Sequence, residues 1–210
     1  MSKHRYLLVG LLILTGGLLA GSSFWKPSET SKSFAGDIER KVDSLLSLMT
    51  LEEKIGQMVQ YSGYAELTGP GEKKGRDLEK AYHITSGRVG SMLTVLAAEE
   101  TRRVQRLAVE NSRLGIPLLF GYDVIHGYKT AFPIPLGEAA SWDLELIEAS
   151  ARTAAREAAA AGVHWTFAPM VDISRDARWG RNMEGAGEDP CLTSQISAAR
   201  VRGFQGEDPS

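Results

Sequence analysis

The sequence predicts an α/β protein in which parallel strands alternate with helices. Three observations support this class: apolar runs of strand length, helical periodicity of apolar residues between those runs, and Gly or Pro at the junctions. The runs are nearly continuous rather than alternating, which is typical of strands covered on both faces of a parallel sheet. This order of elements fits an open doubly wound sheet or a barrel.

The first residues predict export. Lys3 and Arg5 precede an uncharged run, 6–21, which ends in small residues. A basic start, an apolar centre and a small-residue exit are typical of a secretory signal peptide, which we assign to residues 1–22. The alternative is an uncleaved membrane anchor, for which the run is short. Residues 23–36 contain Ser, Thr and Lys and are expected to form a flexible leader.

The composition argues against one class of partner and favours one cellular compartment. The chain has 210 residues, a formal net charge of −2 and one cysteine, Cys191. The absence of a dense Lys/Arg cluster argues against a nucleic-acid partner. One cysteine cannot form a disulfide within the chain, and an exported protein without disulfides suits a Gram-negative periplasm.

Residues 37–210 are expected to form the folded domain. From Asp37 the apolar residues recur at helical spacing and predict one buried stripe. Thr50 followed by Glu53 is a capping box, which predicts a short helix from Leu51. The Gly-rich segment 61–80 is expected to be an exposed loop with a short helix at its end. The stripe consists of Ile38, Val42, Leu45, Leu46 and Met49.

Three apolar segments are expected to be strands: 89–96, 116–122 and 163–170. The helix expected at 97–114 buries Val104, Leu107 and Leu114 and ends at Gly115. Asp143 caps an alanine-rich helix that ends at Gly162 and whose inner face we expect to be Leu144, Ile147, Ala151, Ala154 and Ala158. Asp189 and Pro190 begin a last helix, expected to end at Gly203. Three strands are fewer than a full barrel needs, so the chain is expected to be the front part of a longer protein.

Polar side chains follow two of these strands. Asp123 comes directly after the second, and its carboxylate can accept hydrogen bonds from two hydroxyl groups. A helix cap or a structural ion pair is the alternative for this residue. After the third strand, the loop 175–190 contains Arg178 and Arg181, of which at least one is expected to pair with a carboxylate of its own loop. Arg178 is the better candidate for that structural role. Ligands bind at the carboxyl ends of parallel strands, so both segments are candidate sites.

The histidines and tryptophans near these segments are expected to be structural. His126 could act with Asp123 as an acid/base pair, but a histidine just past a strand is more often a satisfied hydrogen-bonding residue. His164 lies inside a predicted strand, and Trp142 and Trp165 are expected to be core or wall residues. The acidic loop lacks the spacing of an EF-hand, and no metal-protease, serine-hydrolase or nucleotide-binding motif is present, so no metal or cofactor is expected.

Three segments together resemble the N-terminal part of glycoside hydrolase family 3, most of all its periplasmic β-glucosidases. They are LLSLMTLEEKIGQMVQ, GIPLLFGYDVIHGYKTAFPIPLGEAASWD and FAPMVDISRDARWGRNMEGAGEDP. The resemblance runs from about Ile38 to the end of the chain. The N-acetylglucosaminidase branch typically has an acidic, glycine-rich motif in place of YDVIHG and fits less well.

The resemblance implies the N-terminal portion of a (β/α)8 TIM-type barrel, incomplete in this chain. It also implies retaining hydrolysis of terminal β-D-glucosyl residues of β-glucosides or β-gluco-oligosaccharides. In the family, residues matching Asp123 and Arg181 hold hydroxyl groups of the sugar. The nucleophile and the acid/base, which retaining glycosidases hold about 5 Å apart, are expected downstream of Ser210, so no residue here is assigned as catalytic. The alternative is a truncated, non-catalytic exported sugar-binding module. In either case no stable membrane anchor is expected after signal cleavage.

Overall fold

The computed structural model describes residues 29–63 and 74–206. The chain divides into two units, residues 1–48 and 49–210, which are considered separately. The predicted signal peptide, 1–22, lies outside the described residues. None of the helices in the described part is both long and apolar enough for a membrane span.

The first unit contains helix α2, Glu29–Leu48. It begins within the segment 23–36 where the sequence predicts a leader, eight residues before Asp37. The prediction of a buried stripe is wrong for this helix: Ile38 and Val42 are each 44% exposed, and Leu45 and Leu46 are also exposed. Periodicity correctly identified the helix, but burial needs a partner surface, which periodicity does not supply.

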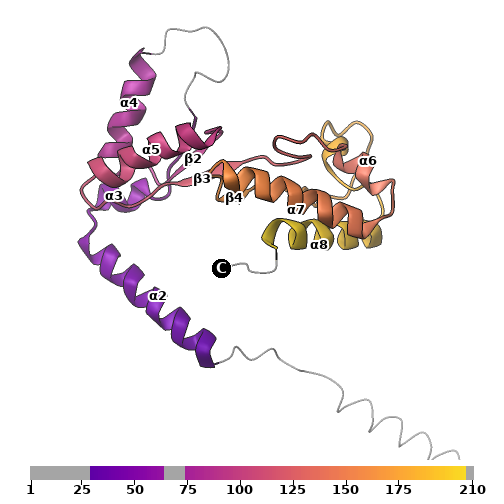
Figure 1. Cartoon of the computed structure of the whole chain (residues 1–210), viewed down its shortest axis with the longest axis horizontal. Coiled ribbons are helices and arrows are strands. Elements are labelled where there is room, and N and C mark those ends of the chain that lie inside the picture. Colours follow the sequence, from indigo (N-terminus) through magenta and orange to yellow (C-terminus); the bar gives the residue numbers. More distant parts are fainter. Residues whose placement is uncertain (1–28, 64–73, 207–210) are drawn as a thin grey trace, which may run out of the picture. The chain divides into compact units, whose positions relative to one another are not determined.

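The second unit is built on a parallel sheet of four strands in the order β1-β2-β3-β4 (Figure 1). The strands are β1 Gln60–Ser62, β2 Ser91–Leu93, β3 Leu119–Tyr122 and β4 Trp165–Thr166. The register pairs Met92 with Phe120 and Gly121 with Trp165. The three predicted strands are confirmed in shortened form. Strand β1 is not predicted by the sequence: it overlaps the start of the segment 61–80, which is expected to be an exposed loop.

Helices precede the first strand of this unit, connect the strands and follow the last one. They are α3 Leu51–Gly56, α4 Lys74–Thr85, α5 Ala98–Asn111, α6 Pro135–Ala139, α7 Leu144–Ala160 and α8 Pro190–Gln205, with a 3-10 turn η2 at Asn182–Glu184. Helix α5 ends at Asn111, with Ser112 as its C-cap, and not at the predicted Gly115. The predicted N-terminal caps are confirmed. Thr50 and Glu53 form the capping box of α3, and the carboxylates of Asp143 and Asp189 accept the N–H groups of Leu146 and Leu192.

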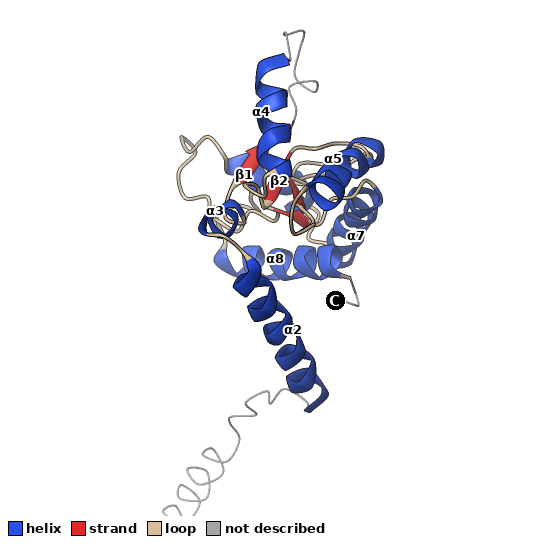
Figure 2. Cartoon of the chain, turned by 90° about the vertical axis from the view of Figure 1, so that its left-hand side faces the viewer, coloured by secondary structure: helices blue, strands red, loops and turns tan. Residues whose placement is uncertain are grey.

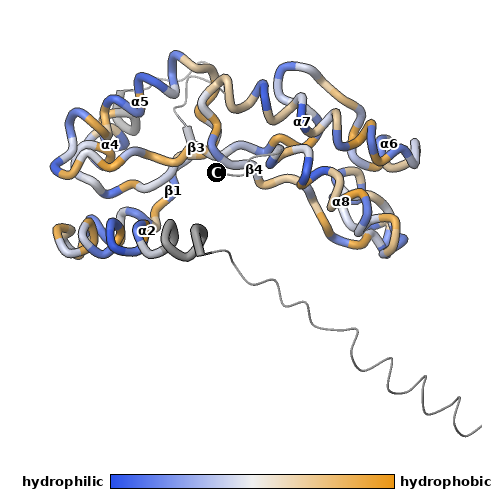
Figure 3. Tube along the Cα trace, turned by 60° about the horizontal axis from the view of Figure 1, so that its bottom comes forward, coloured by the Kyte–Doolittle hydropathy of each residue, from blue (hydrophilic) through white to orange (hydrophobic). Residues whose placement is uncertain are grey.

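The apolar side chains of the sheet pack against the helices. In Figure 2 the strands gather at the centre of this unit, with α5 and α7 on the same side of them. Figure 3 shows hydrophobic residues running along the strands, whereas the outer turns of α5 and α7 are hydrophilic. One buried cluster joins α4 and α5 to the sheet through Ile84, Val104, Met92 and Phe120. The predicted inner face of α7 is confirmed from Ile147 onward, since that residue and the three alanines are buried.

The last helix does not end where the sequence predicts. Gly203 lies inside α8, which continues to Gln205, and Gly206 with a φ of 73° is the residue after its end. Gly203 is buried against α7, where a side-chain carbon would lie 2.7 Å from the Cβ of Ala151. This glycine therefore allows the close approach of α7 and α8, which lie along each other in Figure 1.

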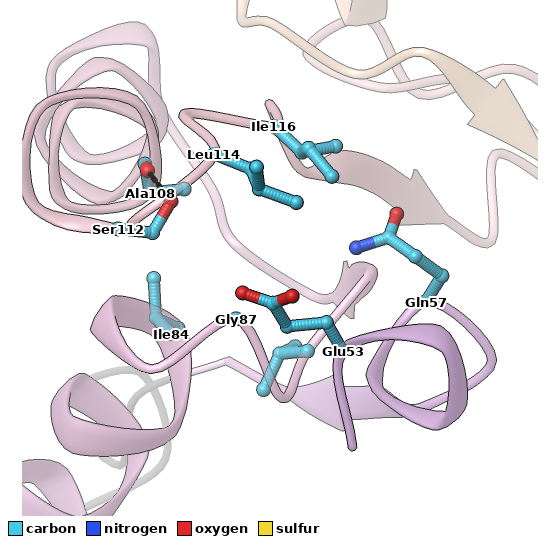
Figure 4. Close-up of a pocket in the computed structure, with 9 residues that line it drawn as sticks. Glu53, Gln57, Ile84, Gly87, Ala108, Ser112, Leu114 and Ile116 are labelled. Atoms are coloured by element: carbon cyan, nitrogen blue, oxygen red, sulfur yellow. Dashed lines mark hydrogen bonds between the residues drawn. The ribbon is translucent and has the colours of Figure 1, made fainter. Parts of the chain in front are cut away.

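A carboxylate anchors α3 to the segment that follows α5. Glu53 accepts hydrogen bonds from the backbone of Thr50 and from Arg113, whose Nε lies 3.0 Å from its Oε1. Figure 4 shows the Glu53 carboxylate pointing into a small pocket that Ile84 and Ser112 also line. The Arg113 hydrogen bonds, followed by that of Thr50, lower the pKa of Glu53 to about 2.

Candidate functional site at the carboxyl ends of β3 and β4

Asp123 is the first residue after β3, and its side chain is exposed. The next residue, Val124, is buried, and its N–H donates to the Tyr122 carbonyl at 3.1 Å and to Thr166 Oγ1 at 3.2 Å. Thr166 belongs to the neighbouring strand β4. The turn that carries Asp123 is therefore fixed on both sides, while its carboxylate stays open to solvent.

Aromatic rings lie beside this strand end. A side chain at Gly121 would overlap the indole of Trp165, so the glycine makes room for that ring. Trp165 packs edge-to-face on Phe167, with ring centroids 5.3 Å apart. Trp165 is 41% exposed and fits the predicted wall role, but Trp142 is 74% exposed. The expectation that Trp142 is a core or wall residue is therefore wrong.

The loop after β4 is held by two arginine–carboxylate pairs. Arg178 pairs with Asp176 at 2.5 Å, and Arg181 binds Glu184 through Nε–Oε1 at 3.0 Å and Nη2–Oε2 at 2.6 Å. The expectation that an arginine pairs within its own loop is confirmed, and both do so. The Arg178 side chain is 91% exposed and that of Arg181 is 58% exposed, so Arg178 is the less buried of the two.

Electrostatic interactions link the Asp123 turn to the loop that carries Arg181. The hydrogen bonds to Glu184 are the main cause of the raised pKa of Arg181, and the charges of Asp172 and Asp123 raise it further. In return, Arg181 lowers the pKa of Glu184. Asp123, directly after β3, and Arg181, in the loop that follows β4, thus interact electrostatically. The pairs described use two of the five N–H donors of Arg181, so this guanidinium can donate while Asp123 accepts.

The contacts of His164 and His126 are those of residues that hold the backbone. His164 Nδ1 accepts the N–H of Phe120 at 3.0 Å, which confirms the expectation that it is a structural residue. His126 is exposed, and its carbonyl accepts the N–H of Phe132. Within the described residues, no hydrogen bond joins His126 to Asp123. The same segments contain no group of three His, Cys, Asp or Glu residues suited to a metal ion.

A buried ion pair between α6 and α8, which the sequence does not predict, contacts the turn after Asp123. Arg200 on α8 donates from Nη1 to Oε2 of Glu138 on α6 at 2.8 Å, and both side chains are less than a tenth exposed. Its Nη2 donates to the carbonyl of Ile125, two residues after Asp123, and Ser150 donates to Oε1 of Glu138 at 2.8 Å. Burial lowers the pKa of Arg200, and the Glu138 charge opposes that effect. Its sequence signal was an arginine on the apolar side of α8, four residues after Ile196.

Comparisons with known proteins agree with this architecture. Residues 50–209 match the glycosyl hydrolase family 3 N terminal domain. The chain is 43% identical over 169 residues to the periplasmic beta-glucosidase of Salmonella typhimurium, covering 80% of this chain and 21% of that protein. It is 32% identical over 190 residues to the lysosomal beta glucosidase of Dictyostelium discoideum, covering 80% of this chain and 23% of that protein.

Solved structures give the same result. A beta-glucosidase from Listeria innocua in complex with glucose matches with a TM-score of 0.71 and 43% identity, over 80% of this chain and 24% of that one. The chain thus spans less than a third of the length of the relatives it matches. The family's N-terminal domain is a TIM-barrel-type α/β fold, in accord with the parallel sheet and its helices. Because the family profile covers about three quarters of the sequence, this chain belongs to glycosyl hydrolase family 3.

Proposed function

We propose that the complete protein is a retaining β-glucosidase and that this chain supplies part of its sugar-binding site. The proposal rests on the position of Asp123 directly after β3 and of Arg181 in the loop after the adjacent strand β4, together with the contribution of the Asp123 charge to the raised pKa of Arg181. The identity to named beta-glucosidases and the glucose complex of the Listeria innocua enzyme support a β-glucoside or β-gluco-oligosaccharide as substrate.

The two side chains offer complementary chemistry to one pyranose ring. The Asp123 carboxylate accepts hydrogen bonds from sugar hydroxyls, and the Arg181 guanidinium donates to their oxygens. Glu184 restricts Arg181 to one orientation, because it binds both Nε and Nη2. Less freedom is then lost when the sugar binds.

Bond cleavage needs two further carboxyl groups. A retaining glycosidase uses a nucleophile and an acid/base about 5 Å apart. Asp176 and Glu184 bind arginines and have lowered pKa values, so neither is suited to donate a proton at neutral pH. We propose that both catalytic groups come from sequence beyond Ser210. The 210-residue chain is then expected to hydrolyse an aryl β-glucoside no faster than background, and clear hydrolysis would refute this assignment.

The sugar-holding roles are tested in the complete protein by Asp123→Ala and Arg181→Ala. Loss of a charged hydrogen bond to the substrate should lower kcat/KM by about 10- to 100-fold. Arg178→Ala is the matched control, since Arg178 pairs with a carboxylate in the same loop but is far more exposed. It should change kcat/KM by less than about twofold. Equal losses in Arg178→Ala and Arg181→Ala would contradict the proposal.

We also propose that the protein is exported to the periplasm. The basic and apolar start of the sequence supports this, as do relatives named periplasmic beta-glucosidases. Fractionation of cells that express the protein tests it: the mature form should appear in the periplasmic fraction, with an N-terminus near residue 23.

A further inference from the structure

We propose that the buried Glu138–Arg200 ion pair positions Asp123 relative to Arg181. The inference rests on the proposed sugar-binding function and assigns a positioning role to two residues that do not contact the sugar. The geometry that supports it is the planar guanidinium of Arg200, which binds two acceptors on different segments.

One of the two acceptors of Arg200 lies in the turn that carries Asp123. Arg200 Nη2 donates to the carbonyl of Ile125, which lies two residues after Asp123 in the chain. Thr166 holds the same turn from the other side through the N–H of Val124. The backbone around Asp123 is thus held by groups from α8 and β4, which restricts the region that its carboxylate can reach.

The Arg181 loop is connected to the same pair. The helix that carries Arg200 begins at Pro190, directly after this loop. Near the loop's end, Ala186 is buried in a cluster with Ala139, Ile147, Ile196 and Ala199. Ala139 is the neighbour of Glu138. The ion pair and this cluster therefore join the end of the Arg181 loop to the Asp123 turn through α6 and α8.

Arginine is suited to this role in a way that lysine is not. A guanidinium presents several N–H donors in a fixed plane and can hold two separate acceptors at once, whereas an ammonium is a compact point charge. Arg200→Lys keeps a cation next to Glu138 and weakens the bond to Ile125. Glu138→Leu with Arg200→Met removes both buried charges together, so no unpaired buried charge remains, and this double variant can replace the lysine variant if that one is unstable. It also leaves the Ile125 carbonyl without its donor, so it tests the same brace.

Two measurements on the complete protein test the proposal. The first is hydrogen exchange of two hydrogen-bonded amides of this turn, that of Val124 and that of Phe132, which donates to the His126 carbonyl. Both should exchange about 10-fold faster or more in both variants if the brace is lost. Amides of α5 serve as an internal reference. Arg202→Lys is the matched control, because Arg202 is on the same helix, is 58% exposed and pairs with Glu148. Exchange in this control should stay unchanged.

The second measurement is the factor by which Asp123→Ala lowers kcat/KM on an aryl β-glucoside. A misplaced Asp123 contributes less to substrate binding, so in the Arg200 variants this factor should be several-fold smaller than the roughly 10- to 100-fold loss expected in the otherwise unaltered protein. Partial unfolding alone would reduce the active fraction and leave the factor unchanged. An unchanged factor together with unchanged exchange would overturn the positioning role. If Asp123→Ala has no effect in the otherwise unaltered protein, the proposed function fails, and the exchange measurement alone decides whether the pair braces the turn.

Discussion

Replacing Gly203 with alanine sets helix propensity against helix packing. Alanine is favoured over glycine in a helix interior by about 1 kcal/mol, so propensity alone predicts stabilisation. The new Cβ would lie 2.7 Å from the Cβ of Ala151 and 3.1 Å from the backbone N of Arg152. Carbon atoms prefer separations of about 3.5–4.0 Å, so α7 and α8 would have to move apart by about 1 Å.

The packing cost should exceed the propensity gain. Overpacking of this kind costs about 1–3 kcal/mol, and here the obstacles include backbone atoms, which cannot rotate away. We expect a net loss of about 1–2 kcal/mol, measured as a lower midpoint in equilibrium urea unfolding with an unchanged slope.

The control for Gly203→Ala is Gly36→Ala in α2. Gly36 is also helical, but no atom lies within 4 Å of the Cβ it would gain. That substitution should not lower the urea midpoint. A Gly203→Ala protein as stable as the unaltered one, or more so, would refute the close contact between α7 and α8.

Three further predictions concern the anchors of the fold. The pKa of Glu53 is about 2 in the folded chain against about 4.3 when unfolded, so its contribution to stability is present above about pH 4.3 and is lost as the pH falls towards 2. Urea midpoints measured from pH 7 to 2 should fall in that range, and Glu53→Gln should flatten the fall; an identical pH profile would count against the anchor. Thr166→Val removes one of the two acceptors of the Val124 N–H and the acceptor of the Ala168 N–H; it should cost about 1 kcal/mol, seen as a lower Tm, while Thr166→Ser should not. Asp143→Ala removes the cap of α7 and should also cost about 1 kcal/mol in urea unfolding; a similar loss in Asp143→Asn would argue against the capping role.

The parts of the fold that depend on neighbouring residues were predictable from the sequence. The capping box at Thr50 and the cap at Asp143 are local patterns, and both begin a helix as expected. Strand β1 was not predictable, because Gln60–Ser62 is polar and short. Its extended state comes from pairing with β2, where Gln60 lies opposite Ser91, thirty-one residues away. The prediction that Gly203 ends α8 is wrong for a related reason. In the sequence, a glycine that ends a helix cannot be distinguished from one that allows two helices to pack closely.

The candidate site shows the same division between local and long-range information. Asp123 could be predicted as a candidate site residue because ligand-binding residues of parallel sheets follow strand ends. Sequence patterns locate those ends. The proximity of Arg181 to Asp123 depends on the path of the intervening loop, and that path follows from the Ser174–Gly187 backbone hydrogen bond and the burial of Ala186.

The role of Arg200 is harder to predict from the sequence than that of Asp123 or Arg181. A charged residue on an apolar helix face indicates a buried partner, because an unpaired buried charge is too costly. The pattern does not say which of the chain's 26 acidic residues that partner is. Glu138 lies 62 residues away and meets Arg200 only when α6 and α8 pack together. Residues that contact a ligand follow strand ends, whereas residues that position them can lie anywhere the packing brings them close. Sequence patterns should therefore identify the first kind in this family more readily than the second.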